Sequence, residues 1–445
     1  MLYRLFKWLF FLTNKAYFRS IYIKGKSKVP KKGSVIFAAN HPSAFMDPIL
    51  LGVEIKRPLY FLARGDVFKN GLLNRIFNML HMIPVYKPDQ SPDEVHKNEL
   101  IFEKCFDHLG KQNTIMIFPE GTSKTERRLR PIKTGLARIA LGAEERNNYK
   151  LGVVIIPIGI NYSNPHYFKS DVFVNFGDPI SVSDFFSSYQ TDQKAGVIAL
   201  TERVKSELEK SIIIIEDERL DQIIKQIEIL YRSKLREEKT SREKGQQDFY
   251  LSKDIVEAVE YFARQTPERL EDFEQKITLY LKRLKRLKIR DTQIRTSQIT
   301  LNLLWQTLYF SIGFPFFLYG LITNFFPFKV AELLSNKIKI REDFVGSVKL
   351  GSGLVAFLLL YIGETIIFAQ FFDLFWSLIF LVSLYPAGLF TANYFKTYYQ
   401  FRGTIKYLRI FMKKSNLITD LKSIRQELVN ELEQAKKEFL EQREA

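Results

Sequence analysis

The chain has 445 residues, which is long for one domain and predicts two or three structural units. Its formal net charge is +17, from 66 Lys and Arg against 49 Asp and Glu, and this excess indicates an anionic partner. The 39 Phe and the long apolar runs near the C-terminus favour a phospholipid membrane over nucleic acid. The single cysteine, Cys105, excludes an intrachain disulfide and a multi-cysteine metal cluster, and its apolar neighbours predict a packed core side chain.

Residues 1–24 predict a helix that docks on a membrane surface. Basic residues interrupt aromatic ones here, as in helices that bury an apolar face among lipid headgroups. The basic residues are Arg4, Lys7, Lys15 and Arg19, and the aromatic ones include Trp8, Phe10, Phe11 and Phe18. The stretch lacks the apolar core and cleavage site of a secretory signal, so we expect it to be retained. The alternative is a helix that packs on a soluble core.

Residues 25–215 predict an α/β domain, in which a mixed sheet is flanked by helices. Five short apolar or β-branched runs bounded by Gly, Pro, Asn or Asp predict strands. They are Ser34–Ala39, Leu59–Leu62, Thr114–Phe118, Val153–Gly159 and Val172–Phe176. Between them, Pro92–Leu109 and Lys133–Arg146 have the apolar spacing of helices that pack against a sheet.

Two charged segments follow. Residues 216–300 predict a basic helical region whose charges form solvated faces with pairs four residues apart. Residues 396–445 predict a charged C-terminal helix with apolar residues near heptad spacing, which either pairs with another chain or folds back. Neither segment indicates a function.

Residues 301–395 predict a transmembrane region of two to four spans. The run 301–326 is about long enough to cross a bilayer, and Pro315 would kink it or turn it into a hairpin. The run from 350 to 395 is about twice as long, which favours two further crossings. It is interrupted by Glu364 and Asp373.

Basic clusters flank this apolar region at residues 282–290 and 406–414. By the positive-inside tendency both ends lie on the cytosolic side, which requires an even number of crossings. Three simple spans do not satisfy this requirement, so either the Pro315 segment is re-entrant or residues 328–350 lie at the membrane surface. We therefore expect a multi-pass membrane protein whose α/β domain faces the cytosol.

The first element that indicates chemistry is the sequence Ala-Ala-Asn-His-Pro-Ser-Ala-Phe-Met-Asp-Pro, which contains His41 and Asp47. A hydroxyl is a poor nucleophile at neutral pH, and an imidazole can take its proton. A carboxylate on the other ring nitrogen fixes the tautomer and stabilises the imidazolium. We expect His41 in a strand-to-helix loop and Asp47 in the first turns of the helix, folded back toward it. Taken alone, such a pair is more often structural than catalytic.

The second element is a strand that leads into Phe118-Pro119-Glu120-Gly121-Thr122-Ser123 and then into a basic run. Gly121 lets the backbone approach an anion, and the hydroxyls of Thr122 and Ser123 can donate to it. Glu120 can accept hydrogen bonds from an acceptor's hydroxyls or orient a neighbouring base. The basic residues are Lys124, Arg127, Arg128, Arg130 and Lys133, which either bind phosphate or form a membrane-facing or solvated surface.

Together the two elements resemble the family of glycerol-phosphate and lysophosphatidate acyltransferases, which carries a His–Asp box followed by a Phe-Pro-Glu-Gly-Thr box. Two weaker blocks of this family also occur in order. The first block lies between the boxes and consists of Phe61–Asn70 and His81–Lys87. The second block follows the boxes at Val153–Tyr162 and precedes the sequence Phe-Gly-Asp-Pro-Ile at 176–180. The resemblance covers roughly residues 25 to 190.

By this resemblance His41 is the general base, Asp47 orients it, and Glu120, Gly121 and Thr122 form part of the acceptor site. The family places basic residues near the acceptor's phosphate, and the matching positions here are Arg64, Lys69 and Lys87. The basic loop provides three further candidate phosphate ligands, Lys124, Arg130 and Lys133. Pro157 matches a proline that shapes the acyl or acceptor pocket, although it could simply end a core strand. The acyl donor implied is a thioester of coenzyme A or acyl carrier protein, with no bound cofactor.

The chain departs from the family pattern at three places. Five residues separate His41 from Asp47, a longer spacing that the resemblance associates with glycerol-3-phosphate as the acceptor. Ser123 stands where an arginine is common, and Lys87 replaces an arginine with a point charge that cannot grip phosphate with two parallel hydrogen bonds. The acceptor therefore stays open between glycerol-3-phosphate and 1-acylglycerol-3-phosphate.

The other histidines show no spacing typical of a metal site, and no glycine-rich nucleotide loop occurs. These histidines are His81, His96, His108 and His166. An alternative from another functional class is a non-catalytic membrane scaffold, which keeps the fold and binds anionic lipids. The simultaneous presence of His41, Asp47 and Glu120 counts against it.

Overall fold

The computed structural model describes residues 2–65, 71, 75, 79–86, 97–235, 241–295, 299–337 and 341–444. The chain divides into two compact units. The first unit comprises Met1–Ile214 together with Leu334–Leu354, and the second comprises Ile215–Leu333 together with Val355–Ala445. The first unit therefore recruits a segment that lies more than a hundred residues further along the chain.

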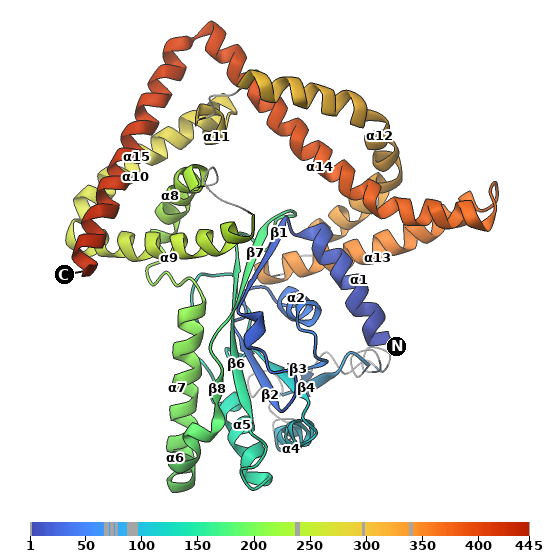
Figure 1. Ribbon diagram of the computed structural model, residues 1–445, viewed down its shortest axis with the longest axis vertical. Helices are drawn as coiled ribbons and strands as arrows, with labels where there is room; N and C mark the ends of the chain where they lie inside the picture. Colours follow the sequence, from blue (N-terminus) through green and yellow to red (C-terminus); the bar gives the residue numbers. More distant parts are fainter. Residues whose placement is uncertain are drawn as a thin grey trace. The chain divides into compact units, whose positions relative to one another are not determined.

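The first unit is built around an eight-stranded mixed sheet with the order β1-β7-β6-β2-β5-β3-β4, and β8 pairs with β6 (Figure 1). Neighbours from β6 to β4 run parallel, whereas β7 pairs antiparallel with β6. The strands are β1 (Ser20–Lys24), β2 (Val35–Ala39), β3 (Leu59–Arg64), β4 (Met82–Val85), β5 (Thr114–Ile117), β6 (Val154–Tyr162), β7 (Asp171–Phe176) and β8 (Ile180–Ser181). The helices are α1 (Leu2–Tyr17), α2 (Met46–Glu54), α4 (Lys97–Gly110), α5 (Gly135–Arg146), α6 (Phe186–Thr191) and α7 (Gln193–Ser211), with short 3₁₀ helices at Lys26–Lys28 and Val182–Phe185.

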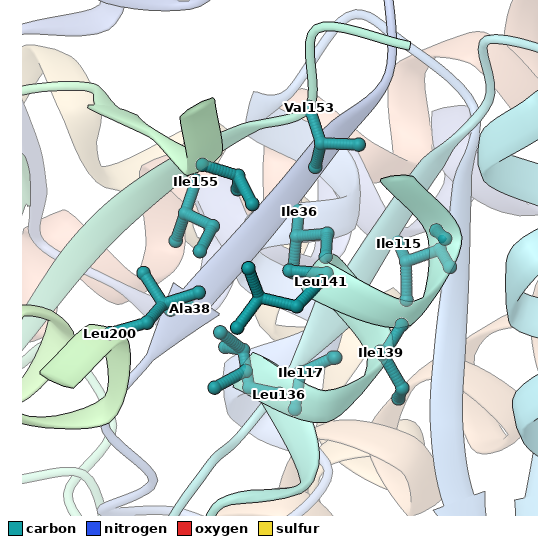
Figure 2. Close-up of a cluster of buried hydrophobic side chains, with 14 of the residues drawn as sticks. Ile36, Ala38, Ile115, Ile117, Leu136, Ile139, Leu141, Val153, Ile155 and Leu200 are labelled. Carbon is teal, nitrogen blue, oxygen red and sulfur yellow. The ribbon is translucent and has the colours of Figure 1, made fainter. Parts of the chain in front are cut away.

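Both faces of the sheet are buried, because alternate residues of each central strand enter different hydrophobic cores. On one face, Ile36 and Ala38 of β2 pack with side chains of β5, α5 and α7 (Figure 2). Cys105 of α4 is fully buried in this core, as the sequence predicts. On the other face, Phe37 packs with residues of α1 and α2 and with Leu350. Because both faces of the sheet are covered, side chains on both sides of the central strands are apolar, and these strands appear in the sequence as continuous apolar runs.

All five predicted strands are present, and no end is shifted by more than three residues. The prediction that residues 1–24 form one helix is wrong for its last part. Helix α1 ends at Tyr17, and Ser20–Lys24 form β1, which pairs with β7. The alternating Ile21, Tyr22 and Ile23 suit a strand better than a helix because β-branched side chains pack well on a pleated surface.

Helix α1 has one face on the core and one face outside. Tyr17 is buried, and Lys7 donates to the carbonyl of Ile55 at the end of α2. The large apolar side chains on its exposed face are Leu5, Trp8 and Phe11. The packing agrees with the soluble-core alternative, and the exposed apolar face leaves membrane docking as a prediction.

In the part of the chain that the structure describes, the second unit is helical. Its helices are α8 (Leu220–Leu235), α9 (Ser241–Gln265), α10 (Pro267–Leu287), α11 (Asp291–Arg295), α14 (Leu374–Lys413), α15 (Ser415–Glu444) and most of α12 (Ile299–Lys337). Helix α15 folds back on α10, where Arg269 pairs with Glu438 at 2.6 Å. A buried Asp291 accepts from Tyr280 at 2.7 Å and from Arg425 at 2.9 Å, so not all charges in this unit are solvated.

Among the residues that the structure describes, three helices are long and apolar enough to cross a membrane: Leu303–Leu334 within α12, α13 (Glu342–Phe368) and α14. Helix α12 continues through both Pro315 and Pro327, so the predicted hairpin at Pro315 is absent from this described helix. Asp373 separates α13 from α14 because its carboxylate caps α14 through the backbone N–H of Trp376.

Candidate active site

The His–Asp box and the Phe-Pro-Glu-Gly-Thr box meet at one edge of the sheet. His41 follows the last residue of β2 by two positions, and Glu120 follows the last residue of β5 by three. The two strands are parallel neighbours with Ala38 opposite Ile117. Carboxyl ends of adjacent parallel strands commonly carry the functional loops of α/β folds, and here they bring the two boxes together.

His41 and Asp47 form a hydrogen-bonded pair of the expected geometry. His41 lies in the loop after β2, Asp47 lies in the first turn of α2, and Nδ1 of His41 is 2.8 Å from Oδ2 of Asp47. The same oxygen accepts the backbone N–H of Ser43 at 2.8 Å. Asp47 is completely buried, whereas the His41 side chain is 17% exposed. The imidazole of His41 is therefore accessible to solvent, whereas the carboxylate of Asp47 is not.

The ring of His41 is held by a second contact. It stacks on the ring of Phe118, with 4.1 Å between centroids and 19° between planes. Asp47 fixes one ring nitrogen and Phe118 fixes the ring plane. In the described residues Nε2 has no hydrogen-bond partner, so this nitrogen is the one that can accept a proton.

The Tyr162 hydroxyl donates to Oδ1 of Asp47 at 2.8 Å from the end of β6. Burial and the neighbouring carboxylate raise the pKa of Tyr162 well above its usual value, so it stays a neutral donor. Asn40 makes a second link to β6, because its amide pairs with both backbone groups of Ile160, at 2.7 and 3.1 Å. Sequence reasoning missed both residues, although Tyr162 stands at the end of the fourth block and Asn40 directly precedes His41.

Glu120 ties the two boxes together through the backbone. One carboxylate oxygen accepts the N–H of His41 at 2.8 Å, and the other accepts the N–H of Arg130 at 3.3 Å. Burial raises the pKa of Glu120 to about 7, against the opposing effect of these two N–H donors. Glu120 therefore fixes the backbone at His41 and at Arg130, and both roles predicted for it stay predictions.

The loop after β5 begins with a tight turn. Gly121 donates to the Phe118 carbonyl at 2.9 Å, with Pro119 at the position that favours proline. Gly121 has φ +70°, and a Cβ added there would lie 3.2 Å from the Lys133 side chain, so Lys133 lies directly over the turn. The backbone N–H of Lys124 donates to the His41 carbonyl at 3.1 Å and joins this loop to the base.

Two of the predicted phosphate ligands, Arg130 and Lys124, pair with the carboxylate of Glu126, which the sequence did not single out. Glu126 accepts from Arg130 at 2.7 Å and lies 2.8 Å from the Lys124 ammonium. Partial burial opposes the effect, but these two cations lower the pKa of Glu126. Lys133 is exposed beside the Gly121 turn.

The remaining predicted residues fall in different places. Thr122 is half-buried in the loop, and the Ser123 hydroxyl donates to Asp343. Arg64 ends β3 at the same edge of the sheet, whereas Lys69 and Lys87 lie outside the described residues. Pro157 is buried within β6 opposite Ala38, so it does not end that strand.

The other described histidines contact other residues. His81 stacks on Tyr60, as does His108, with 4.6 and 3.9 Å between ring centroids. His166 lies 3.6 Å from Glu342, and His96 is outside the described residues. Among the residues that the structure describes, no three His, Cys, Asp or Glu side chains are grouped as a metal site requires.

Part of the chain is similar to known acyltransferases. Residues 20–161 match the family model described as Acyltransferase. The chain is 24% identical over 318 residues to glycerol-3-phosphate O-acyltransferase 1 of Saccharomyces cerevisiae, which covers 52% of this chain and 42% of the yeast protein. It is 24% identical over 142 residues to the chloroplastic 1-acyl-sn-glycerol-3-phosphate acyltransferase LPAT1 of Arabidopsis thaliana, covering 32% of this chain and 36% of that protein.

A solved structure, the 1-acyl-sn-glycerophosphate acyltransferase PlsC of Thermotoga maritima, aligns with a TM-score of 0.33 and 18% identity over 46% of this chain and 79% of that chain. The chain spans about two-fifths of the length of the two curated relatives. Both boxes lie inside the matched residues 20–161, so the part of the chain that contains them is similar to the acyltransferase family.

Proposed function

We propose that this chain is a membrane-bound O-acyltransferase of phospholipid biosynthesis. It moves an acyl group from acyl-CoA or acyl carrier protein to glycerol-3-phosphate or 1-acylglycerol-3-phosphate. The observation that carries the proposal is the 2.8 Å contact of His41 Nδ1 with buried Asp47, which leaves Nε2 for a substrate proton in an acyltransferase-family domain. Two relatives named for acylation of these acceptors support the substrate class.

In the proposed reaction His41 Nε2 takes the proton of the acceptor hydroxyl as its oxygen attacks the thioester carbonyl. The new C–O bond forms, the C–S bond breaks, and the departing thiolate takes the proton from the imidazolium. Asp47 holds the tautomer with the proton on Nδ1 and stabilises the positive ring. The acceptor attacks directly, so no acyl-enzyme is formed.

The acceptor's phosphate is proposed to lie against the loop at residues 120–133. Lys133 over the Gly121 turn is the cation best supported there, with Thr122 as a hydroxyl donor. Arg130 and Lys124 would contribute while also paired with Glu126. The additional proposed binding residues are Arg64, Lys69, Lys87, Ser123 and Pro157. The five-residue spacing of the His–Asp box favours glycerol-3-phosphate as the acceptor.

The proposed membrane topology is based on the assignment of residues to the two compact units. Leu334–Leu354 belong with His41 to the first unit, so the start of α13 lies on the same side of the membrane as the active site. Among described residues no candidate span precedes α12. We therefore propose that α12 begins and ends on that one side without crossing, and that α13 and α14 supply two crossings. This arrangement places both basic flanks on one side, which we propose is the cytosol.

The direct test is an acceptor panel with purified protein in detergent. Labelled acyl-CoA and acyl carrier protein thioesters are offered with glycerol-3-phosphate, dihydroxyacetone phosphate and several lysophospholipids. We expect transfer to glycerol-3-phosphate or 1-acylglycerol-3-phosphate. If no acceptor is acylated while anionic vesicles are still bound, the chain is a membrane scaffold and the proposal fails.

A further inference from the structure

The first turns of α13 are part of the catalytic unit. Asp343 is 4% exposed, and its carboxylate accepts from the Ser123 hydroxyl and from the Arg341 guanidinium at 2.8 and 3.0 Å. Arg341 also donates to the Ser123 carbonyl at 2.9 Å. A buried carboxylate thus joins the start of α13 to the loop that follows β5.

A second contact joins α13 to the His–Asp box. The Ser347 hydroxyl accepts the backbone N–H of Met46 at 3.0 Å and lies 3.4 Å from the Ser43 carbonyl. The packing is close at Gly346, where a Cβ would lie 2.4 Å from the carbonyl oxygen of Pro165. Leu350 is 1% exposed in the core beneath the sheet. The helix is therefore seated by apolar packing as well as by polar contacts.

Two short paths lead from these contacts to the base. On the first, Ser347 holds Ser43, whose N–H donates to the Asp47 oxygen that binds His41. On the second, Asp343 holds Ser123, and the next residue, Lys124, donates to the His41 carbonyl. The same helix end thus holds both loops that carry the proposed chemistry.

The turn held by Ser347 is strained. Ala44 has φ +32° although it is not glycine, and Met46 donates back to the Ser43 carbonyl at 2.8 Å. Strain of this kind persists only where surrounding contacts fix the backbone. The turn lies within the five residues between His41 and Asp47, so the longer spacing and the contact from α13 occur at the same place.

We propose that Arg341, Asp343 and Ser347, here called the α13 clamp, are positioning residues that hold the His41 loop and the Ser123 loop in the geometry for acyl transfer. The proposal rests on the proposed function. The clamp touches neither the imidazole nor the acceptor directly; it acts through Ser43 and Ser123. Because a misplacement of about 1 Å can cost on the order of 100-fold in rate, loss of the clamp should lower kcat with little effect on binding.

The test uses the full-length protein in detergent and measures kcat and KM for the acceptor. For Asp343→Ala we expect kcat to fall by about 10-fold or more, with KM changed less than about two-fold. Asp343→Asn keeps an oxygen acceptor for Ser123 and should recover part of the rate. Lys349→Gln is the matched control. It removes a contact of the same helix to the His166 carbonyl, at 3.0 Å, and should keep the wild-type kcat.

Two milder changes keep the proposal testable if Asp343→Ala does not fold. Ser347→Ala should lower kcat, and a double-mutant cycle of Ser123→Ala with Asp343→Asn should give less than the product of the two single effects. Wild-type kcat in Ser347→Ala and Asp343→Asn would overturn the clamp. An inactive wild-type protein would instead contradict the proposed function, so the two failures are distinct.

Discussion

The Tyr162 hydroxyl reaches Oδ1 of Asp47 at 2.8 Å, while the other oxygen of that carboxylate holds His41 and the Ser43 N–H. Two of these donors lie in the loop after β2 and the third lies at the end of β6, and the carboxylate between them is fully buried. A buried charge is tolerated only when its oxygens accept hydrogen bonds, so Tyr162 helps to hold Asp47 against the His41 ring.

Replacement of this phenol should weaken catalysis. In Tyr162→Phe, Asp47 loses one charge-assisted hydrogen bond worth roughly 1.5 kcal/mol, which corresponds to about 10-fold in kcat if orientation of the base is lost. Acyl-transfer kinetics measure the effect. Tyr167→Phe serves as the control because that side chain is 68% exposed, and it should leave kcat unchanged. Equal rates for both variants would mean that Asp47 does not need the phenol.

The turn at Gly121 should tolerate no side chain. Gly121→Ala forces φ +70° on a residue with a Cβ and presses that Cβ against Lys133, so kcat/KM for the phosphate acceptor should fall by about 10-fold. Gly135→Ala is the matched control, because a Cβ there meets nothing within 4 Å at the start of α5. If both variants behave alike, the turn does not shape the acceptor site.

Glu120 should make stability depend on pH near neutrality. Its pKa is raised from 4.5 to about 7, so the folded protein keeps this proton more tightly than the unfolded chain does. The resulting stabilisation is complete below about pH 4.5 and is lost as pH rises through about 7, a change on the order of 3 kcal/mol. Glutamine does not titrate. The Tm of wild type minus the Tm of Glu120→Gln should therefore decrease as pH rises from 5.5 to 8.

Glu126→Gln is the control for this measurement. The pKa of Glu126 is lowered, so Glu126 is ionised in both folded and unfolded protein across that pH range. The difference in Tm between Glu126→Gln and wild type should therefore not change with pH. A level difference for Glu120→Gln as well would show that the carboxyl group of Glu120 is not held in its protonated form by burial.

The topology can be tested with single cysteines. Burial raises the pKa of Cys105 to about 12, so the native thiol should not react with a maleimide in the folded protein. If α12 does not cross the membrane, as proposed, Gln370→Cys should be labelled from the opposite side to Lys31→Cys and Ser415→Cys. Three full crossings would instead place Gln370 with Lys31 and would put Ser415 on the other side.

The sequence was sufficient to predict the sheet and the contact of His41 with Asp47, because both follow from local patterns. Apolar runs mark the strands, and a loop followed by a helix start brings the carboxylate back to the imidazole. The strand at Ser20–Lys24 was missed because its five residues follow directly on a helix with similar aromatic and basic composition.

Contacts between distant segments could not be predicted in this way. Ser123 and Asp343 are 220 positions apart, and no spacing pattern predicts their contact. From the sequence alone, Asp343 is simply the start of an apolar span. In the same way, the backbone role of Glu120 and the pairing of Glu126 depend on how the loop folds after the turn at Gly121. Composition alone predicted only that this loop binds an anion or forms a basic surface.

The most direct test of the account compares acyl transfer by wild type and His41→Ala, both shown to be folded by thermal unfolding in detergent. Loss of a general base should lower kcat by at least about 100-fold, whereas His166→Gln, a histidine outside the site, should keep the wild-type rate. A His41→Ala protein that transfers acyl groups at the wild-type rate would contradict the mechanism.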